Sequence, residues 1–246
     1  MGTCSPLRTQ CREDMNILYL LHAPFELPGI IESWASERGF KQIYVSPFQG
    51  DKLPSYSSFD LVIAMGGPQS AVHLDGAPYL KDEIVLIRDA MKAKIPVLGF
   101  CLGAQLIGEA LGVRAERSPF KEIGVYPISL TEEGMKDPLL SHCPKEFPVF
   151  HWHNDMPGLT KESLILAKSA GCPRQVIRYS PLAYGLQCHP EMTLQGASAL
   201  IKNCSNDFTA DKYVQTPKDI LSHDYHSLNF KNMTNILDNF LLVVTK

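Results

Sequence analysis

Residues 96–105 read Pro-Val-Leu-Gly-Phe-Cys-Leu-Gly-Ala-Gln, and this stretch decides the fold. Its apolar start predicts a short buried strand that ends at Phe100. The apolar residues that follow share one helical face and predict a helix that Gly112 ends; they are Leu106, Ile107, Ala110 and Leu111. A strand that turns through Gly-x-Cys-x-Gly into a helix is typical of a nucleophile elbow.

Cys101 lies at the centre of this turn and is the candidate nucleophile. Gly99 and Gly103 permit a sharp turn that lifts the sulfur above the carboxyl edge of the sheet. The partial positive charge at the helix N-terminus favours the reactive thiolate. The backbone N–H of Leu102 lacks an acceptor within the helix and is free to face an oxyanion. Taken alone, the motif also suits a structural cysteine in a glycine-rich turn.

Residues 184–191, Tyr-Gly-Leu-Gln-Cys-His-Pro-Glu, predict another strand, which ends in His-x-Glu. A histidine in the position of His189 can reach a nucleophile on a neighbouring strand. Glu191 can accept a hydrogen bond from the second ring nitrogen, which fixes the tautomer and stabilises the imidazolium. Although His-x-Glu alone is common in surface turns, its occurrence together with the elbow points to one catalytic edge.

A third motif, Gly66-Gly67-Pro68-Gln69-Ser70, follows the predicted buried strand at 60–65. A backbone N–H of this loop can act as a second oxyanion donor that faces the elbow. A tight turn between strand and helix is the alternative interpretation. All three motifs follow the carboxyl ends of strands, where open α/β sheets bind their ligands.

The rest of the chain predicts an α/β fold with an open, mostly parallel sheet and helices on both faces. Strands are expected at 16–21, 42–46, 60–65 and 96–100, and helices at 28–38 and 80–91. After Ile123 shorter strand-like segments predict antiparallel pairs added to the sheet; they are 125–130, 149–152, 164–169, 175–179 and 184–188. A further helix is expected at 194–203.

The chain divides into a polar prefix (1–14) that we expect to be disordered, a catalytic domain (15–204) and a helical extension (205–246). The extension carries an apolar stripe at helical spacing, made of Met233, Ile236, Leu237, Phe240, Leu241 and Val244. Such a stripe predicts a helix that packs on the domain's own core. A helix that binds a partner is the alternative.

Composition excludes several classes of protein. Lys and Arg total 23 against 26 Asp and Glu, a net charge of −3, so no basic excess favours nucleic acid. No apolar stretch approaches the roughly 18 to 20 residues that span a bilayer, and the first residues do not resemble a signal peptide. The seven cysteines form no Cys-x-x-Cys pair, which fits a reducing compartment. We therefore expect a cytoplasmic protein that binds neither nucleic acid nor membrane.

The three motifs, in this order and spacing, resemble the class I glutamine amidotransferase domain, and most of all the glutaminase half of GMP synthetase and its stand-alone relatives. The resemblance covers about residues 16 to 204 and implies a flavodoxin-like α/β domain. His153-Asn154-Asp155 is similar to the family's His-Gly-Asp segment, with Asn154 in place of glycine. Cys188 stands where the family usually has Phe, which implies altered packing beneath His189.

The resemblance also implies roles for individual residues. The catalytic triad would be Cys101, His189 and Glu191, and the N–H groups of Gly67 and Leu102 would form the oxyanion hole. Substrate contacts are expected at Gln105 and Gly66, and no cofactor is expected. The implied reaction is hydrolysis of the γ-amide of glutamine through a γ-glutamyl thioester, which releases glutamate and ammonia.

The acceptor of the ammonia stays open. The chain contains neither a Ser-Gly-Gly-x-Asp-Ser pyrophosphatase loop nor a P-loop, so it does not itself activate an acceptor with ATP. Either a separate synthetase subunit receives the ammonia in trans, or the protein is a stand-alone hydrolase of γ-glutamyl peptides or amides.

Other classes of protein fit less well. In α/β-hydrolases the acid precedes the histidine along the chain, whereas here Glu191 follows His189. A non-catalytic DJ-1-like binding protein shares the elbow but does not account for the Gly-Gly-Pro-x-Ser loop. His151 and His153 share one face of a strand, but no third ligand has a recognisable spacing, so no metal site is expected.

Overall fold

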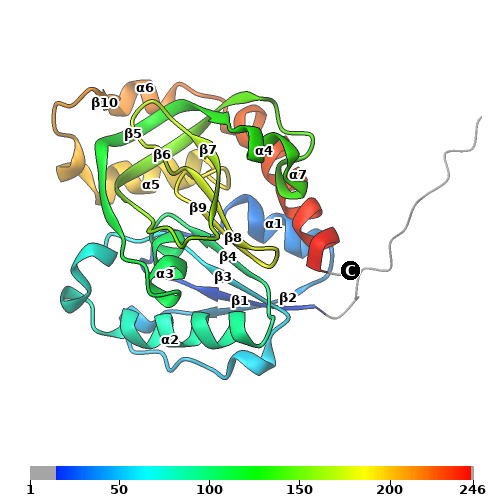
Figure 1. Cartoon of the computed structure of the whole chain (residues 1–246). Coiled ribbons are helices and arrows are strands. Elements are labelled where there is room, and N and C mark those ends of the chain that lie inside the picture. Colours follow the sequence, from blue (N-terminus) through cyan, green and yellow to red (C-terminus); the bar gives the residue numbers. More distant parts are fainter. Residues whose placement is uncertain (1–14, 245–246) are drawn as a thin grey trace, which may run out of the picture.

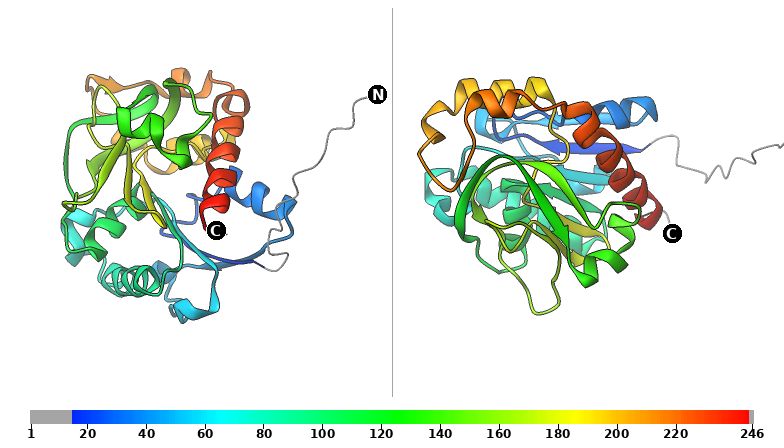
Figure 2. Two further views of the ribbon diagram at one scale, coloured as in Figure 1. Left: turned by 45° about the vertical axis from the view of Figure 1, so that its right-hand side comes forward. Right: turned by 90° about the horizontal axis from the view of Figure 1, so that it is seen from above.

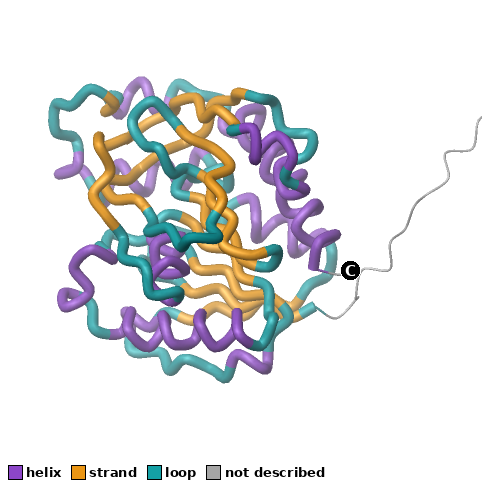
Figure 3. The backbone as a smooth tube through the Cα atoms, viewed as in Figure 1, coloured by secondary structure: helices purple, strands orange, loops and turns teal. Residues whose placement is uncertain are grey.

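We describe the protein from a computed structural model that places residues 15–244 (Figure 1). The expected prefix, residues 1–14, lies outside the described residues. One sheet runs through the molecule and carries helices on both faces. Figure 3 shows the strands in orange and the helices in purple. The expected α/β class is therefore confirmed.

The parallel half of the sheet consists of the strands that the buried apolar runs predict. Three of these strands end side by side, so the segments that follow them, which carry the three motifs, meet at one edge of the sheet. The strand order is β2 (Lys41–Val45), β1 (Asn16–Leu20), β3 (Leu61–Ala64), β4 (Val97–Phe100) and β9 (Ala183–Leu186).

The other half of the sheet is antiparallel, as the shorter segments after Ile123 indicate. From β9 it continues through β8 (Val176–Ser180) and β7 (Leu164–Lys168) to a long hairpin formed by β5 (Glu116–Leu130) and β6 (Glu146–Met156). The complete sheet is therefore mixed, with the antiparallel strands added to its parallel part as the sequence predicts.

The β5–β6 hairpin is longer than the sequence predicts. β5 starts nine residues before the expected Val125, because Glu116–Leu130 is one continuous strand. Its register shifts between Arg117 and Glu122, as in a β-bulge. An irregularity of this kind disturbs the alternation of inward and outward side chains from which a strand is recognised. A short parallel strand, β10 (Tyr213–Val214), pairs with β5 and was not expected.

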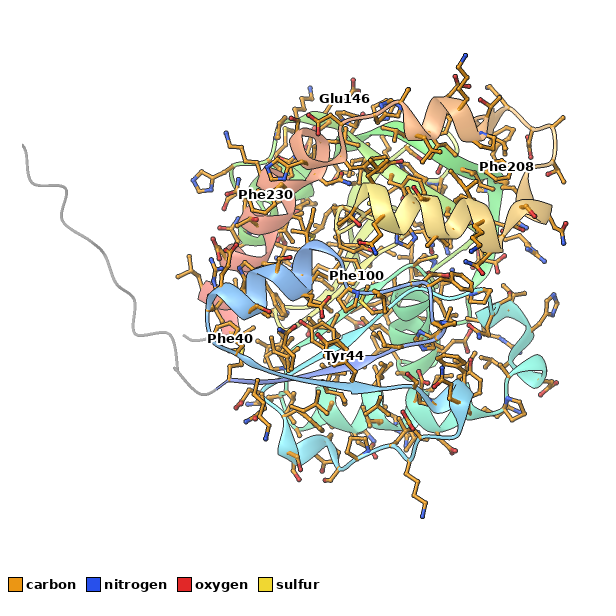
Figure 4. The ribbon with its side chains drawn as sticks, turned by 180° about the vertical axis from the view of Figure 1, so that it is seen from behind. Phe40, Tyr44, Phe100, Glu146, Phe208 and Phe230 are labelled. Carbon is orange, nitrogen blue, oxygen red and sulfur yellow. The ribbon has the colours of Figure 1, made fainter. Side chains whose placement is uncertain are left out.

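Alternate residues of β1 face opposite sides of the sheet. Because both sides are buried, the strand is apolar throughout. Ile17 and Tyr19 belong to the core cluster beneath α1 (Ile30–Glu37) and α7 (Tyr225–Val244). Leu18 and Leu20 belong to the cluster beneath α2 (Tyr79–Lys92) and α3 (Leu102–Ala110). A strand buried on both faces is the expected product of a continuous apolar run. Figure 4 shows the side chains that fill the space between α1 and the strands.

A third apolar cluster joins β5 and β6 to α5 (Leu194–Asn203) and α6 (Pro217–Leu221). α5 has the bounds that the sequence predicts, whereas α6 was not expected. The remaining short helices lie in the connections; they are α4 (Glu132–Lys136), η1 (Pro47–Gln49), η2 (Tyr56–Ser58), η3 (Ala71–Gly76), η4 (Pro138–Leu140) and η5 (Ser205–Asp207).

α7 carries the apolar stripe of the sequence and lies beside α1 (Figure 2). Met233 and Phe240 are fully buried among core residues. Trp34 on α1 donates a hydrogen bond from Nε1 to Asp238 Oδ1 at 2.8 Å. Among residues 15–244, none of the helices combines the length and the apolar character needed to cross a lipid bilayer.

Candidate active site

Cys101 stands between β4 and α3 in a backbone conformation that residues with side chains rarely adopt. Its φ of 48° lies in the left-handed region, which costs a non-glycine residue on the order of 1–3 kcal/mol and is typical of functional sites. A Cβ atom at Gly99 would collide with the Gly103 carbonyl group, and one at Gly103 would collide with Ala64. Both glycines are therefore required by the tight packing of the turn.

His189 follows β9, and its imidazole lies beside both Glu191 and Cys101. Glu191 Oε1 lies 2.7 Å from His189 Nδ1, whereas the Cys101 thiol donates to the Trp152 carbonyl at 3.6 Å. Burial works to lower the pKa of His189, but the charge of Glu191 and the nearby Cys101 thiol hold it well above 6.5. The backbone N–H of His189 donates to the Phe150 carbonyl at 2.8 Å and fixes this segment on β6.

Gln187 is a neighbour of the sulfur for which the sequence predicts no role. Its Nε2 lies 3.2 Å from Cys101 Sγ. Gln105 Nε2 donates to Gln187 Oε1 at 3.0 Å, so Gln105 acts on the nucleophile's surroundings through Gln187. Gln105 Oε1 is buried and has no hydrogen-bond partner among the described residues.

Gly66 lies where three functional side chains converge. A Cβ atom placed on it would collide with Glu26 Oε2 and would lie 3.2 Å from His189 Cε1 and 3.5 Å from Cys101 Cβ. A Cβ atom on Gly67 would collide with His22 and would lie 3.1 Å from Leu102 Cδ2. The two glycines therefore bring the loop after β3 against both the elbow and the histidine.

His22, just after β1, contacts the loop that follows β3 and holds it in place. Its Nδ1 lies 3.2 Å from the Gly66 carbonyl oxygen and its Nε2 lies 2.7 Å from Glu83 Oε2 on α2. Both neighbours are acceptors, so the geometry suits a ring that donates from both nitrogens. In a trans peptide the carbonyl group and the following N–H point in opposite directions. A Gly66 carbonyl turned toward His22 therefore turns the Gly67 N–H away from it.

A cavity of about 210 Å³ opens at the nucleophile and is called the Cys101 cavity below. Gly67, Leu102 and Gln105, three of the predicted site residues, line it together with Cys101. Gly66 lines a neighbouring cavity instead. The roles predicted for these residues are thus compatible with their positions, and those roles stay predictions.

The outer wall of the Cys101 cavity carries both signs of charge. Lys121 Nζ bonds only neutral oxygens among the described residues, the Asp207 carbonyl at 3.1 Å and Thr209 Oγ1 at 3.3 Å. Asp155 accepts from Ser70 Oγ at 2.6 Å and from Arg117 at 2.9 Å. The Ser70 bond joins the Gly-Gly-Pro-x-Ser loop to the His-Asn-Asp segment, which lie 85 residues apart.

Glu26, in the loop between β1 and α1, also lines the Cys101 cavity. Burial raises its pKa to about 7, against the smaller lowering effects of His189 and His22. It has no hydrogen-bond or ion-pair partner among residues 15–244. An unpaired carboxyl group beside a candidate catalytic histidine is a functional candidate. The signal available in the sequence is its position just after a predicted strand, at the edge where ligands bind.

His151 and His153 have a carboxylate partner that sequence spacing did not reveal. Glu122 lies opposite His153 in the β5–β6 hairpin, and the three side chains are close enough to share one metal ion. However, Glu122 Oε2 already lies 3.2 Å from His153 Nε2 and accepts from Ser169 at 2.8 Å and from Gln175 at 2.7 Å. These three contacts occupy Glu122 Oε2. Hydrogen bonds alone therefore explain this buried cluster as well as a metal site would.

The family model for class-I glutamine amidotransferases matches residues 35–208 of the chain. A glutamine amidotransferase-like protein, YfeJ of Salmonella typhimurium, is 39% identical over 235 residues, which are 93% of this chain and 98% of YfeJ. The GMP synthase of Thermosipho africanus is 34% identical over 134 residues, which are 54% of this chain and only 24% of that protein.

Among solved structures, the crystal structure of a glutamine amidotransferase from Thermotoga maritima superposes with a TM-score of 0.83 at 25% sequence identity. The superposition covers 92% of this chain and 98% of that one. Because the family model spans most of the chain and YfeJ matches it over nearly its whole length, this chain belongs to the class-I glutamine amidotransferase family.

Proposed function

We propose that the protein is a Cys-His-Glu amidohydrolase that cleaves the γ-amide of glutamine, or of a related γ-glutamyl compound, through a γ-glutamyl thioester. The observation that carries the proposal is that Cys101, His189 and Glu191 lie together beside Gly66, with 2.7 Å between the Glu191 Oε1 and His189 Nδ1 atoms. The raised pKa of His189 supports an imidazolium at this position, which is the form that can protonate the leaving nitrogen.

In the first half of the proposed reaction the Cys101 thiolate attacks the γ-carbonyl carbon and forms the sulfur–carbon bond. The oxyanion that develops faces the N–H groups of Gly67 and Leu102. His189 gives its proton to the amide nitrogen as the carbon–nitrogen bond breaks, so ammonia or an amine leaves. Glu191 acts through His189, because it fixes the ring and stabilises its positive charge.

In the second half, water hydrolyses the thioester. The neutral His189 takes a proton from water, the hydroxide equivalent attacks the acyl carbon, and the tetrahedral intermediate releases the Cys101 thiolate. Glutamate is the product, and His189 ends as imidazolium beside the thiolate. At the end of the cycle Cys101 and His189 therefore have the same protonation states as at the start.

The charges of the Cys101 cavity support a zwitterionic γ-glutamyl group as substrate. Lys121, which has only neutral oxygen partners among the described residues, is a suitable partner for the α-carboxylate. The free Oε1 of Gln105 can accept from the α-ammonium group or the amide of the substrate.

A partner in trans is part of the proposal. The chain spans only 24% of the Thermosipho africanus GMP synthase, and it has none of the ATP-binding loops that activate an acceptor. The first candidate is therefore a glutaminase that passes ammonia to a separate synthetase subunit. The second candidate is a stand-alone γ-glutamyl hydrolase, which is compatible with a relative, YfeJ, that matches this chain over 98% of its own length.

Release of ammonia from glutamine, compared with release of amines from a panel of γ-glutamyl peptides, tests the function. Efficient turnover of the purified protein indicates a hydrolase, whereas weak turnover that a partner stimulates indicates a glutaminase subunit. We expect the C101A and H189A variants to lose more than about 10³-fold in kcat. Unchanged turnover in C101A contradicts the proposal.

Labelling with a glutamine-analogue electrophile provides a second test with internal controls. We expect one adduct, on Cys101. Cys143 and Cys204 are the matched controls, because burial raises the pKa of each thiol to about 11 and keeps both in the unreactive form. Cys204 is the sharper control since it also lines the Cys101 cavity. An adduct on either of these cysteines, with Cys101 unmodified, overturns the assignment.

A further inference from the structure

A second cavity, of about 410 Å³, lies at the histidine rather than at the nucleophile. His189 and Glu191 line it, together with Gly66 and the loop between β1 and α1. Glu26 lines both this cavity and the Cys101 cavity. We call this second space the His189 cavity. The proposed mechanism uses only the Cys101 cavity for the γ-glutamyl group, so the His189 cavity needs its own explanation.

The two cavities differ in charge. The wall of the Cys101 cavity contains both signs, with Arg117 and Lys121 beside Glu26, Asp155 and Asp207. The wall of the His189 cavity contains Glu26, Glu32 and Glu191 and, among the described residues, no Lys or Arg. The imidazolium of His189 offsets one of these charges and burial raises the pKa of Glu26 to about 7, but the wall keeps a net negative charge. The His189 cavity therefore favours a cation over a carboxylate.

Two of these carboxyl groups have unused hydrogen-bonding capacity. Glu191 Oε2 is buried without a partner among residues 15–244, whereas Oε1 bonds His189. Glu26 is half-buried and has no hydrogen-bond or ion-pair partner in the same part of the chain. The buried Glu191 Oε2 is costly without a donor unless a ligand supplies one. An ammonium group, with three donors, meets this need.

The chemistry of the reaction says which part of a substrate would occupy this space. His189 gives its proton to the nitrogen that leaves, so the leaving group emerges beside His189. The γ-glutamyl half meanwhile stays bonded to Cys101. A leaving group larger than ammonia therefore has the His189 cavity next to it, and Glu26, which lines both cavities, marks where the two adjoin.

We propose that the His189 cavity is the leaving-group site and that it takes an amine with a second, positively charged end, so that the substrate is a γ-glutamyl conjugate of a diamine-type compound. This inference rests on the proposed function. The reaction breaks the bond between the γ-carbonyl carbon and the amide nitrogen, and His189 protonates that nitrogen. The diamine leaves with its distal ammonium unchanged, and water then releases glutamate from Cys101.

Three γ-glutamyl amides with four-carbon leaving groups test the proposal: 1,4-diaminobutane, butylamine and 4-aminobutyrate. They differ mainly in the far end of the leaving group, which is an ammonium, a methyl or a carboxylate group. We expect kcat/KM to be at least about tenfold higher for the ammonium-ended amide than for the methyl-ended one, with the carboxylate-ended amide lowest. Calorimetric binding of the three amides to C101A gives the same order without turnover.

The variants E26Q and E32Q each replace a carboxyl group by a neutral amide with little change of shape. We expect each to lower the ratio of kcat/KM between the ammonium-ended and methyl-ended amides several-fold. E37Q is the matched control, because Glu37 is an exposed residue of the same helix as Glu32 and does not line the cavity. E37Q leaves the ratio unchanged.

The outcomes separate this inference from the proposed function. The leaving-group site is overturned if kcat/KM is equal for the three amides, if the carboxylate-ended amide is preferred, or if neither E26Q nor E32Q changes the ratio. In each of these cases, hydrolysis of glutamine that the C101A substitution abolishes leaves the proposed function standing. If the protein hydrolyses neither glutamine nor any of the amides, both proposals fail.

Discussion

His22 and Glu83 form a buried pair that lies beneath the loop of the candidate oxyanion hole, with 2.7 Å between Nε2 and Oε2 and both side chains inaccessible to solvent. The second ring nitrogen faces the Gly66 carbonyl. Because the carbonyl of Gly66 and the N–H of Gly67 belong to one peptide plane, the pair sets the direction of that N–H. Glu83, on α2, is therefore connected to the reaction centre through the His22 ring, the Gly66 carbonyl and the Gly67 N–H.

Replacing Glu83 by Ala tests this connection. We expect E83A to lower kcat about tenfold with little change in KM, because a misdirected oxyanion donor stabilises the transition state less but leaves ground-state binding intact. E83Q keeps an oxygen acceptor for His22 and recovers most of kcat. The thermal midpoint of each variant is measured alongside, and an E83A variant that folds normally and keeps full kcat contradicts the positioning role.

Glu191 governs the alkaline limit of activity in the proposed mechanism. His189 must be protonated to release the leaving group, and the Glu191 carboxylate helps to hold its pKa above the ordinary value. In E191A the pKa of His189 falls, so the alkaline limb of the kcat/KM profile moves to lower pH. We also expect kcat to fall by about 10- to 100-fold, less than in C101A. A steady-state pH profile measures both effects, and an unshifted alkaline limb refutes the assignment.

His151 makes the fold sensitive to acid. Burial lowers its pKa to about 3, against the raising effect of Glu122. As the pH falls below about 6.5, the unfolded chain binds a proton at this position that the folded chain does not bind. We therefore expect His151 to reduce the free energy of unfolding by about 2 kcal/mol between pH 7 and pH 5.

Urea titrations at the two pH values measure this loss in the wild type and in H151Q. The variant has no titrating group at this position, so its stability decreases less between pH 7 and pH 5. H73Q is the control, since His73 is exposed and its removal leaves the difference unchanged. An equal decrease in wild type and H151Q shows that another group causes the acid sensitivity.

The apolar stripe of α7 supplies a matched pair of substitutions. Phe240 is 2% exposed and packs edge-on against Tyr184, with 5.8 Å between ring centroids, whereas Leu242 is 44% exposed. We expect F240A to cost about 3–5 kcal/mol of stability and L242A less than about 0.5 kcal/mol. Chemical denaturation measures both values, and similar losses in the two variants contradict packing of the stripe on the core.

The division into a catalytic domain (15–204) and an extension (205–246) packed on it is a related proposal. Truncation after Asn203 removes α7 and exposes the core residues beneath it, including Tyr184. We expect the thermal midpoint to fall steeply or the chain to remain unfolded. A truncated protein with an unchanged midpoint shows instead that the extension is independent of the domain.

The residues of the elbow could be predicted because their constraints are local. Gly99, Cys101 and Gly103 lie within one turn, and the contacts that exclude a Cβ atom involve that turn and the neighbouring strand. The pairing of His189 with Glu191 is likewise set by a spacing of two residues. The buried strands could be predicted because both faces are covered, which produces continuous apolar runs.

The residues that escaped prediction depend on which segments meet in space. His22 and Glu83 are 61 residues apart, and only the packing of α2 against the sheet brings them together. Glu122 meets His153 through a hairpin register that shifts at a bulge. Glu26 is unusual only because it is unpaired inside a cavity, and no local pattern of residues reports the absence of a partner.

The contact between α1 and α7 also affects the order in which the protein can fold during synthesis. Trp34 and Asp238 are hydrogen-bonded although 204 residues separate them, and Met233 and Phe240 complete the same core cluster as Ile17 and Ile31. On the ribosome, the first strand and helix must therefore wait for almost all of the remaining chain before this side of the core can close. During that interval their apolar side chains are exposed to chaperones, so the nascent chain is a better chaperone substrate than the finished protein.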